Sequence, residues 1–173
     1  MIVTVLGSCI AACIFERVLG LGGMNHFMLP GEDHGIMKNR TNTMNFELGA
    51  TRYGSIAMER LINDILKLGG QRSNLEVKIF GGGRITDTSL DIGAGNISFV
   101  REYLKMENID LVNEDVGGES PRKVYYIPAS NEAFVKKIRS ISNKAIHVRE
   151  NAYVSRLNDG ELNGEICFLQ DIS

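Results

Sequence analysis

The chain has 173 residues, of which 43% are hydrophobic, and its 19 basic and 21 acidic side chains give a formal net charge of −2. This length and composition suffice for one core, so we expect a single domain over residues 1–173, and the balanced charge argues against a nucleic-acid partner. No apolar run approaches the roughly 18 residues of a membrane span, so we expect no membrane insertion.

Short apolar runs in the first thirty residues predict strands. Residues 2–6 are β-branched and apolar. Two strand-length runs follow at 9–15 and 20–29, and we expect them to pair as an antiparallel hairpin. Residues 31–50 are polar and rich in Asn and Thr, so they predict a surface loop.

Two helices and further strands are predicted in the rest of the chain. Residues 51–70 predict a helix that buries one stripe, formed by Tyr53, Ala57, Leu61, Ile62, Ile65 and Leu68. Residues 96–109 predict a second helix, capped by Asn96. The expected strands are 75–83, 123–127, 133–138 and 165–169. Strands outnumber helices and mostly form hairpins, which favours mixed or antiparallel sheet with two helices packed outside.

A cysteine and a histidine lie on the two strands of the first expected hairpin. A turn centred between Arg17 and Val18 places Cys9 opposite His26, with Cβ atoms roughly 4.5–5.5 Å apart. At that distance an imidazole can take the thiol proton and stabilise the thiolate, which is the form that attacks carbonyl carbon. Gly7 and Ser8 are small, so backbone N–H groups beside Cys9 can point at a developing oxyanion. This pattern predicts acyl transfer on an amide, an ester or a thioester.

Cys9 also has simpler interpretations. A cysteine in an apolar run is more often a packing residue than a nucleophile. The letters LGSC resemble the lipid-attachment box of a bacterial lipoprotein, but no Lys or Arg and only eight residues precede Cys9. A zinc site made from Cys9, Cys13, His26 and Cys167 lacks the usual ligand spacing, so we expect no metal and no other cofactor.

The remaining candidate features predict structural roles. Cys13 is expected in the core, Cys167 in the core or the tail, and His34 and His147 at the solvent-exposed surface. The glycines of GGGR at 81–84 lack the Gly-Lys-Ser/Thr ending of a P-loop, so they predict a tight turn after a buried strand. Three cysteines are few and odd in number, which favours a reducing, cytoplasmic location.

Several stretches taken together resemble the CheD family of bacterial chemotaxis. They occur in the family's order over residues 3 to about 138 and read TVLGSCIAACIF, LGLGGMNHFMLP, RYGSIAMERLINDILKLG, VKIFGGG, IGAGNISFVREYL, EDVGGESPRKVYYIP and FVKKI. The resemblance implies a mixed α+β fold in α/β/β layers, with two packed mixed or antiparallel sheets and two main helices outside, as in deamidating bacterial toxins. Residues 140–173 form a C-terminal extension of unknown role. Family members carry a further segment before the first motif, so native residues before Met1 are expected.

The resemblance also implies an activity, the deamidation of particular glutamines on methyl-accepting chemotaxis receptors. In that mechanism Cys9 attacks the carboxamide carbon, and His26 takes the thiol proton and later protonates the departing ammonia. Family members carry a threonine six residues before the cysteine, where this chain has Val3. Thr4, five residues before Cys9, is the candidate for the third catalytic group, although a regular strand would turn it to the opposite face.

The expected partners are the cytoplasmic helices of the receptors and a phosphatase of the CheC type, with the protein itself a monomer. A non-catalytic regulator that only binds receptor or phosphatase is the alternative function. A cysteine hydrolase of the same fold that acts on another amide or ester is a third.

Overall fold

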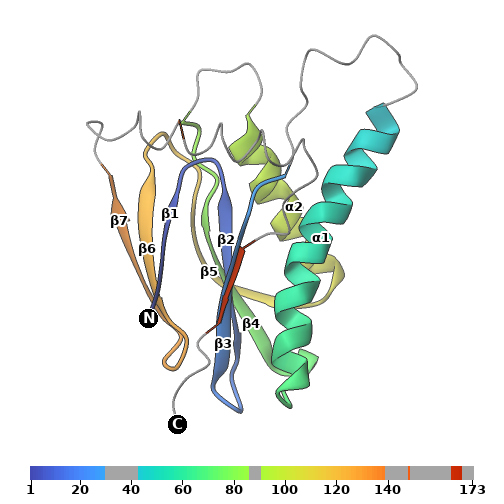
Figure 1. Cartoon of the computed structure of the whole chain (residues 1–173), viewed down its shortest axis with the longest axis vertical. Coiled ribbons are helices and arrows are strands. Elements are labelled where there is room, and N and C mark those ends of the chain that lie inside the picture. Colours follow the sequence, from blue (N-terminus) through green and yellow to red (C-terminus); the bar gives the residue numbers. More distant parts are fainter. Residues whose placement is uncertain (30–42, 86–90, 139–147, 149–164, 169–173) are drawn as a thin grey trace.

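The structure of the protein is a computed structural model, and it describes residues 1–29, 43–85, 91–138, 148 and 165–168. Figure 1 shows these residues arranged in layers, with one sheet on the outside, a second sheet in the middle and the helices against the far face of the second sheet. The mixed α+β class with two sheets and two main helices outside is therefore confirmed.

The outer sheet has three antiparallel strands in the order β1-β6-β7. They are β1 (Ile2–Leu6), β6 (Arg122–Ile127) and β7 (Glu132–Lys137). The strands predicted at 123–127 and 133–138 are confirmed as β6 and β7, which pair antiparallel. Side chains alternate along β1, so that Ile2 and Leu6 are buried against the middle sheet while Val3 is 43% exposed.

The middle sheet has five strands in the order β5-β4-β2-β3-β8. They are β2 (Ile10–Glu16), β3 (Leu21–Phe27), β4 (Leu75–Gly81), β5 (Asp110–Val116) and β8 (Glu165–Phe168). The strands pair antiparallel except for β4 and β5, which run parallel. β5 was not predicted, because most of its side chains are exposed and its sequence DLVNEDV therefore lacks the alternating apolar pattern of a strand.

Two helices cover the middle sheet, α1 (Thr43–Lys67) and α2 (Ile92–Met106), and a short 3-10 helix, Arg72–Asn74, precedes β4. α1 begins at Thr43, so the loop predicted for residues 31–50 is wrong from that point on, because Met44, Glu47, Leu48 and Ala50 are good helix formers despite the polar residues among them. No helix among the described residues is long and apolar enough to cross a membrane.

The structure corrects the sequence interpretation of the helices at two positions, Leu68 and Asn96. Leu61, Ile62 and Ile65 of α1 are buried as predicted, but Leu68 lies beyond the helix end and is 50% exposed. Asn96 does not cap α2. The cap is Asp91, whose Oδ1 accepts a hydrogen bond from Ala94 N at 2.9 Å.

The central strand β2 contributes to two apolar cores. Ile10, Ala12 and Ile14 pack toward the helices, whereas Ala11 and Cys13 face the outer sheet. Burial on both faces explains why this segment reads as one continuous apolar run. Cys9 belongs to the core between the two sheets, and this layer contains the candidate site.

Candidate active site

The turn between β2 and β3 determines which residues of the two strands face each other. It contains four residues, from Arg17 to Gly20, so the turn expected between Arg17 and Val18 is wrong and His26 pairs with Ala11 instead of Cys9. The longer turn is closed by a hydrogen bond from Gly20 N to Glu16 O at 3.0 Å, and Gly20 has a φ of 69°. A shift of two residues leaves every side chain on its original face of the sheet, so Cys9 and His26 still face the same layer.

Cys9 ends the short turn that leads from the outer sheet into the middle sheet. It is 5% exposed, and its Sγ lies 3.9 Å from Sδ of Met28. Met28 is the residue that would pair with Cys9 if the β2–β3 ladder continued by one residue. His26 is two residues before Met28, so in this extended pairing it would be a diagonal neighbour of Cys9, for which sheet geometry gives a Cα separation of roughly 7–8 Å. A side chain as long as histidine can reach across a diagonal of that size.

Thr4 of the outer sheet contacts His26 of the middle sheet. Thr4 Oγ1 and His26 Nδ1 are 3.2 Å apart. The expectation that Thr4 points to the wrong face is incorrect, because β1 and β2 belong to different sheets and alternation cannot be counted through the turn between them. The neighbouring Val3 occupies the exposed face of β1.

Three consecutive carbonyl groups in the turn before β2 accept hydrogen bonds from the protein interior. Gly83 N donates to Gly7 O at 2.7 Å, and Gly82 N donates to Cys9 O at 2.7 Å. Between them, Asn96 Nδ2 donates to Ser8 O at 2.8 Å. Because C=O and the following N–H point in opposite directions in a trans peptide, the N–H groups of Ser8 and Cys9 point away from these donors.

The glycines that follow β4 allow this close approach. Gly81 has a φ of 111°, and a Cβ added to it would lie 2.1 Å from Cys9 O. Consecutive glycines after a buried strand often indicate a close backbone contact, so the sequence contained the signal but not its partner. The glycine segment 81–83, for which a tight turn was predicted, therefore supports the turn that carries Cys9 through these contacts.

Asn96 and Met28 are site residues that the sequence interpretation missed. Asn96 is fully buried, and besides donating to Ser8 O it accepts a hydrogen bond from Leu29 N at 2.8 Å. A polar residue at helical spacing from the buried Val100 and Leu104 was the available signal. Met28 is also buried and accepts from Ser8 Oγ at 3.4 Å.

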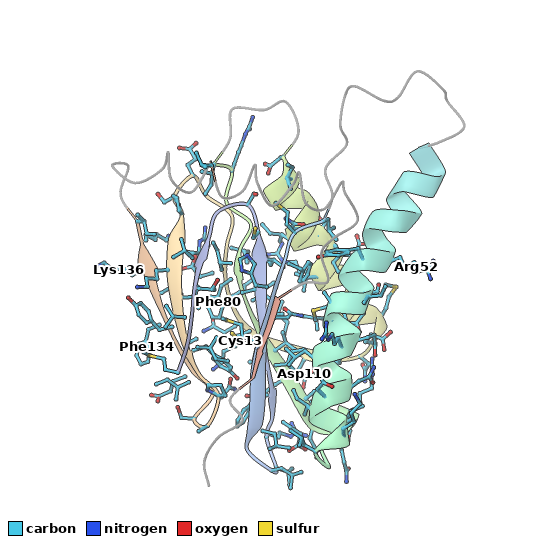
Figure 2. The ribbon with its side chains drawn as sticks, in the orientation of Figure 1. Cys13, Arg52, Phe80, Asp110, Phe134 and Lys136 are labelled. Atoms are coloured by element: carbon cyan, nitrogen blue, oxygen red, sulfur yellow. The ribbon has the colours of Figure 1, made fainter. Side chains whose placement is uncertain are left out.

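The other two cysteines, Cys13 and Cys167, lie on β2 and β8. Figure 2 shows Cys13 and Phe80 within the layer between the sheets, where Cys13 is fully buried. Burial raises the pKa of the Cys13 thiol far above its ordinary value, and the nearby Lys78 opposes this only in part. Cys167 lies on β8 opposite Met24, and its side chain is outside the described part of the structure.

The predicted surface positions of His34 and His147 lie outside the described residues. Within the described ranges, no group of three or more His, Cys, Asp and Glu side chains is placed to hold a metal ion.

The fold and the site together define a two-sheet α+β protein in which a threonine hydroxyl contacts an imidazole between the sheets, in the layer that also contains the Cys9 thiol. The chain belongs to the CheD family, since the family model described as CheD chemotactic sensory transduction matches residues 28–137. It is 48% identical over 168 residues to a protein of Janthinobacterium sp. (strain Marseille), covering 96% of this chain and 79% of that protein. It is 47% identical over 170 residues to a protein of Thiobacillus denitrificans, and the match covers 96% of this chain and 80% of that protein. Both relatives are named probable chemoreceptor glutamine deamidase CheD.

Proposed function

We propose that this protein hydrolyses the side-chain amides of glutamine residues on chemoreceptors, giving glutamate and ammonia. The observation that carries the proposal is the contact between Thr4 Oγ1 and His26 Nδ1, because it holds an imidazole in the layer that contains the Cys9 thiol, in a chain whose relatives are named as deamidases. A protein-glutamine glutaminase needs that combination, a nucleophile and an adjacent base whose ring is held by a third group.

In the proposed first step, Nε2 of His26 accepts the thiol proton of Cys9, and Sγ attacks the carboxamide carbon of the substrate glutamine. The tetrahedral intermediate collapses when the imidazolium gives its proton to the leaving nitrogen, so that ammonia departs and a thioester remains. In the second step, His26 takes a proton from water as the hydroxide attacks the thioester. The proton then returns to Sγ, and glutamate is released.

The role of Thr4 in this mechanism is to fix the imidazole. Its hydroxyl contacts Nδ1, and this leaves Nε2 as the ring nitrogen that exchanges protons with sulfur and substrate. The oxyanion is proposed to bind backbone N–H groups of the turn formed by Gly7, Ser8 and Cys9, whose carbonyls are all directed to the interior. Every step is carried out by side chains, backbone amides and water, so the mechanism requires no metal or cofactor.

The proposed substrates are the cytoplasmic helices of methyl-accepting receptors, which places the reaction in the cytoplasm. We further propose a phosphatase of the CheC type as a second partner that competes for the same surface, and a monomeric enzyme. A regulator that binds either partner without catalysis would have no use for the Thr4–His26 contact beside a cysteine, so the enzyme is the better-supported function.

Incubation of the protein with cytoplasmic fragments of chemoreceptors tests the proposal. Peptide mass spectrometry is expected to find glutamine converted to glutamate at particular positions, with release of ammonia. Binding to the fragments without conversion would favour the regulator. Hydrolysis of other amides or esters, but not of receptor glutamines, would indicate a cysteine hydrolase of different specificity.

A further inference from the structure

We infer that Asn96 is a positioning residue for the proposed reaction, holding the turn that carries Cys9 against the end of the strand that carries His26. The inference rests on the proposed function and adds to it a residue on α2 that contacts neither substrate nor reacting atoms. It follows from three features of the structure, namely the two hydrogen bonds of Asn96, the end of the β2–β3 ladder and the orientation of one peptide group.

The side-chain amide of Asn96 joins two backbone segments that are distant in the sequence. Its Nδ2 donates to Ser8 O at 2.8 Å, and its Oδ1 accepts from Leu29 N at 2.8 Å. Ser8 directly precedes Cys9, and Leu29 follows His26 by three residues. The partners also define the orientation of the amide, since a carbonyl requires a donor and a backbone N–H requires an acceptor.

This bridge lies where the strand pairing stops. The last pair of the ladder between β2 and β3 is Ile10 with Phe27, so Cys9 and Met28 are beyond it. Asn96 links the two chain segments just past that point. Asn96 therefore fixes the distance between the turn that carries Cys9 and the chain that follows His26, at a point where the pairing of β2 with β3 has ended.

The donor end of Asn96 also orients a group of the proposed oxyanion site. Because Asn96 holds the carbonyl of the Ser8–Cys9 peptide, the N–H of Cys9 in the same planar group points the opposite way. An amide directed in advance at the developing charge is worth more than one that must reorient during the reaction. Loss of the donor end is thus expected to lower kcat and to change KM little.

The isosteric change Asn96→Asp separates the two ends of the bridge. A carboxylate at position 96 can still accept a hydrogen bond from Leu29 N. It has no proton to donate to Ser8 O, so one carboxylate oxygen would face the carbonyl oxygen of Ser8 without a hydrogen bond. Burial raises the pKa of the introduced carboxyl, and once it is protonated it can donate to Ser8 O again. The activity of this variant relative to wild type is therefore expected to rise as the pH falls.

Asn25 provides a matched control. It is also buried, and its amide also makes two backbone hydrogen bonds, accepting from Ala12 N at 3.1 Å and donating to Ala57 O at 3.2 Å. These bonds tie β2 to α1 on the opposite face of the sheet from Cys9. Its loss is expected to lower stability as much as the loss of Asn96, without changing the Cys9 turn.

The test compares Asn96→Asp, Asn96→Ala, Asn25→Asp and Asn25→Ala in the full-length protein. Deamidation of receptor fragments is expected to show kcat lowered about 10- to 100-fold by both Asn96 variants with KM within about twofold, and kcat within about threefold of wild type for both Asn25 variants. The kcat ratio of Asn96→Asp to wild type is expected to recover toward low pH. If Asn96→Ala does not fold, the isosteric Asn96→Asp gives the result.

Iodoacetamide labelling of Cys9, followed by mass spectrometry across pH, provides a readout that needs no substrate. The labelling midpoint is expected to move to higher pH in Asn96→Asp, since Cys9 is held less firmly beside His26, and to stay unchanged in Asn25→Asp. Failure of wild type to deamidate any fragment would reject the proposed function, and the labelling would still test Asn96. The inference would be overturned if Asn96→Asp kept the kcat and the labelling midpoint of wild type. It would also be overturned if Asn25→Asp lost as much kcat as Asn96→Asp.

Discussion

Thr4 Oγ1 lies 3.2 Å from His26 Nδ1, and this contact connects the outer sheet to the middle sheet at the candidate base. Thr4 is on β1 and His26 is on β3, strands that share no backbone pairing. The orientation of the imidazole therefore depends on how the two sheets pack, and changes in that packing are expected to affect the reaction.

Replacement of Thr4 by Val tests this dependence, because valine keeps the shape of threonine and removes the hydroxyl. A net hydrogen bond contributes about 0.5–1.5 kcal/mol, so we expect kcat to fall by about 2- to 12-fold, and further if the ring turns. Thr4→Ser, which keeps the hydroxyl, is expected to retain most of the activity. The matched control is Val3→Ala on the exposed face of β1, and an equal loss of kcat in that variant would contradict the role of Thr4.

Gly81→Ala is expected to destabilise the protein strongly. The φ of 111° at Gly81 is unfavourable for any residue with a Cβ, and the new atom would lie 2.1 Å from Cys9 O. Backbone strain of this kind costs about 1–3 kcal/mol, and the overlap adds to it. Gly95→Ala on α2 is the control, because no atom of the described residues outside the helix backbone lies within 4 Å of its added Cβ, and it is expected to stabilise the helix by roughly 0.5–1 kcal/mol. Equal melting temperatures for the two variants would contradict this account.

The carboxylate of Glu16 is expected to make stability depend on pH. Hydrogen bonds from backbone N–H groups, first of all that of Leu19, hold the pKa of Glu16 below its ordinary range. A lowered folded-state pKa means that the stabilisation is present above the unfolded pKa of about 4.3 and is lost as pH falls through the folded value. In Glu16→Gln the melting temperature should therefore fall less steeply between about pH 6 and pH 3. Parallel curves for the variant and wild type would contradict the prediction.

Cys13 is expected to be dispensable for activity. Burial between the sheets keeps it a thiol, because its pKa is raised far above neutral pH. Cys13→Ala leaves a small cavity that costs about 1 kcal/mol of stability, and kcat should stay within about twofold of wild type. In the native protein iodoacetamide should modify Cys9 before Cys13. A large loss of kcat in Cys13→Ala would show that the second thiol takes part.

The sequence predicted those parts of the fold whose burial follows a regular pattern. Apolar runs located β1, β2, β3 and β4, and the helical stripe located the buried face of α1. β5 was missed because a mostly exposed edge strand carries polar residues. The start of α1 was missed because residues 31–50 were interpreted together as one polar, Asn- and Thr-rich loop, although the helix begins within them at Thr43.

The candidate site was predictable in residue identity more than in geometry. The sequence predicts Cys9 and His26 as candidates on one face of the sheet, but their register depends on a turn whose four-residue length the sequence does not specify. Thr4 was assigned to the wrong face, because nothing in the sequence shows that the chain changes sheets at Gly7. Asn96 was interpreted as a cap, since its partners Ser8 and Leu29 lie 88 and 67 residues away along the chain.

The most direct test of the central claim is the conversion of receptor glutamines to glutamates by wild type and Cys9→Ala, measured by peptide mass on the same receptor fragment. The account predicts conversion by wild type and a rate lower by at least about 10⁴-fold in the variant, with its melting temperature and fragment binding preserved. Conversion by Cys9→Ala at the wild-type rate would contradict the claim that the Cys9 sulfur is the nucleophile.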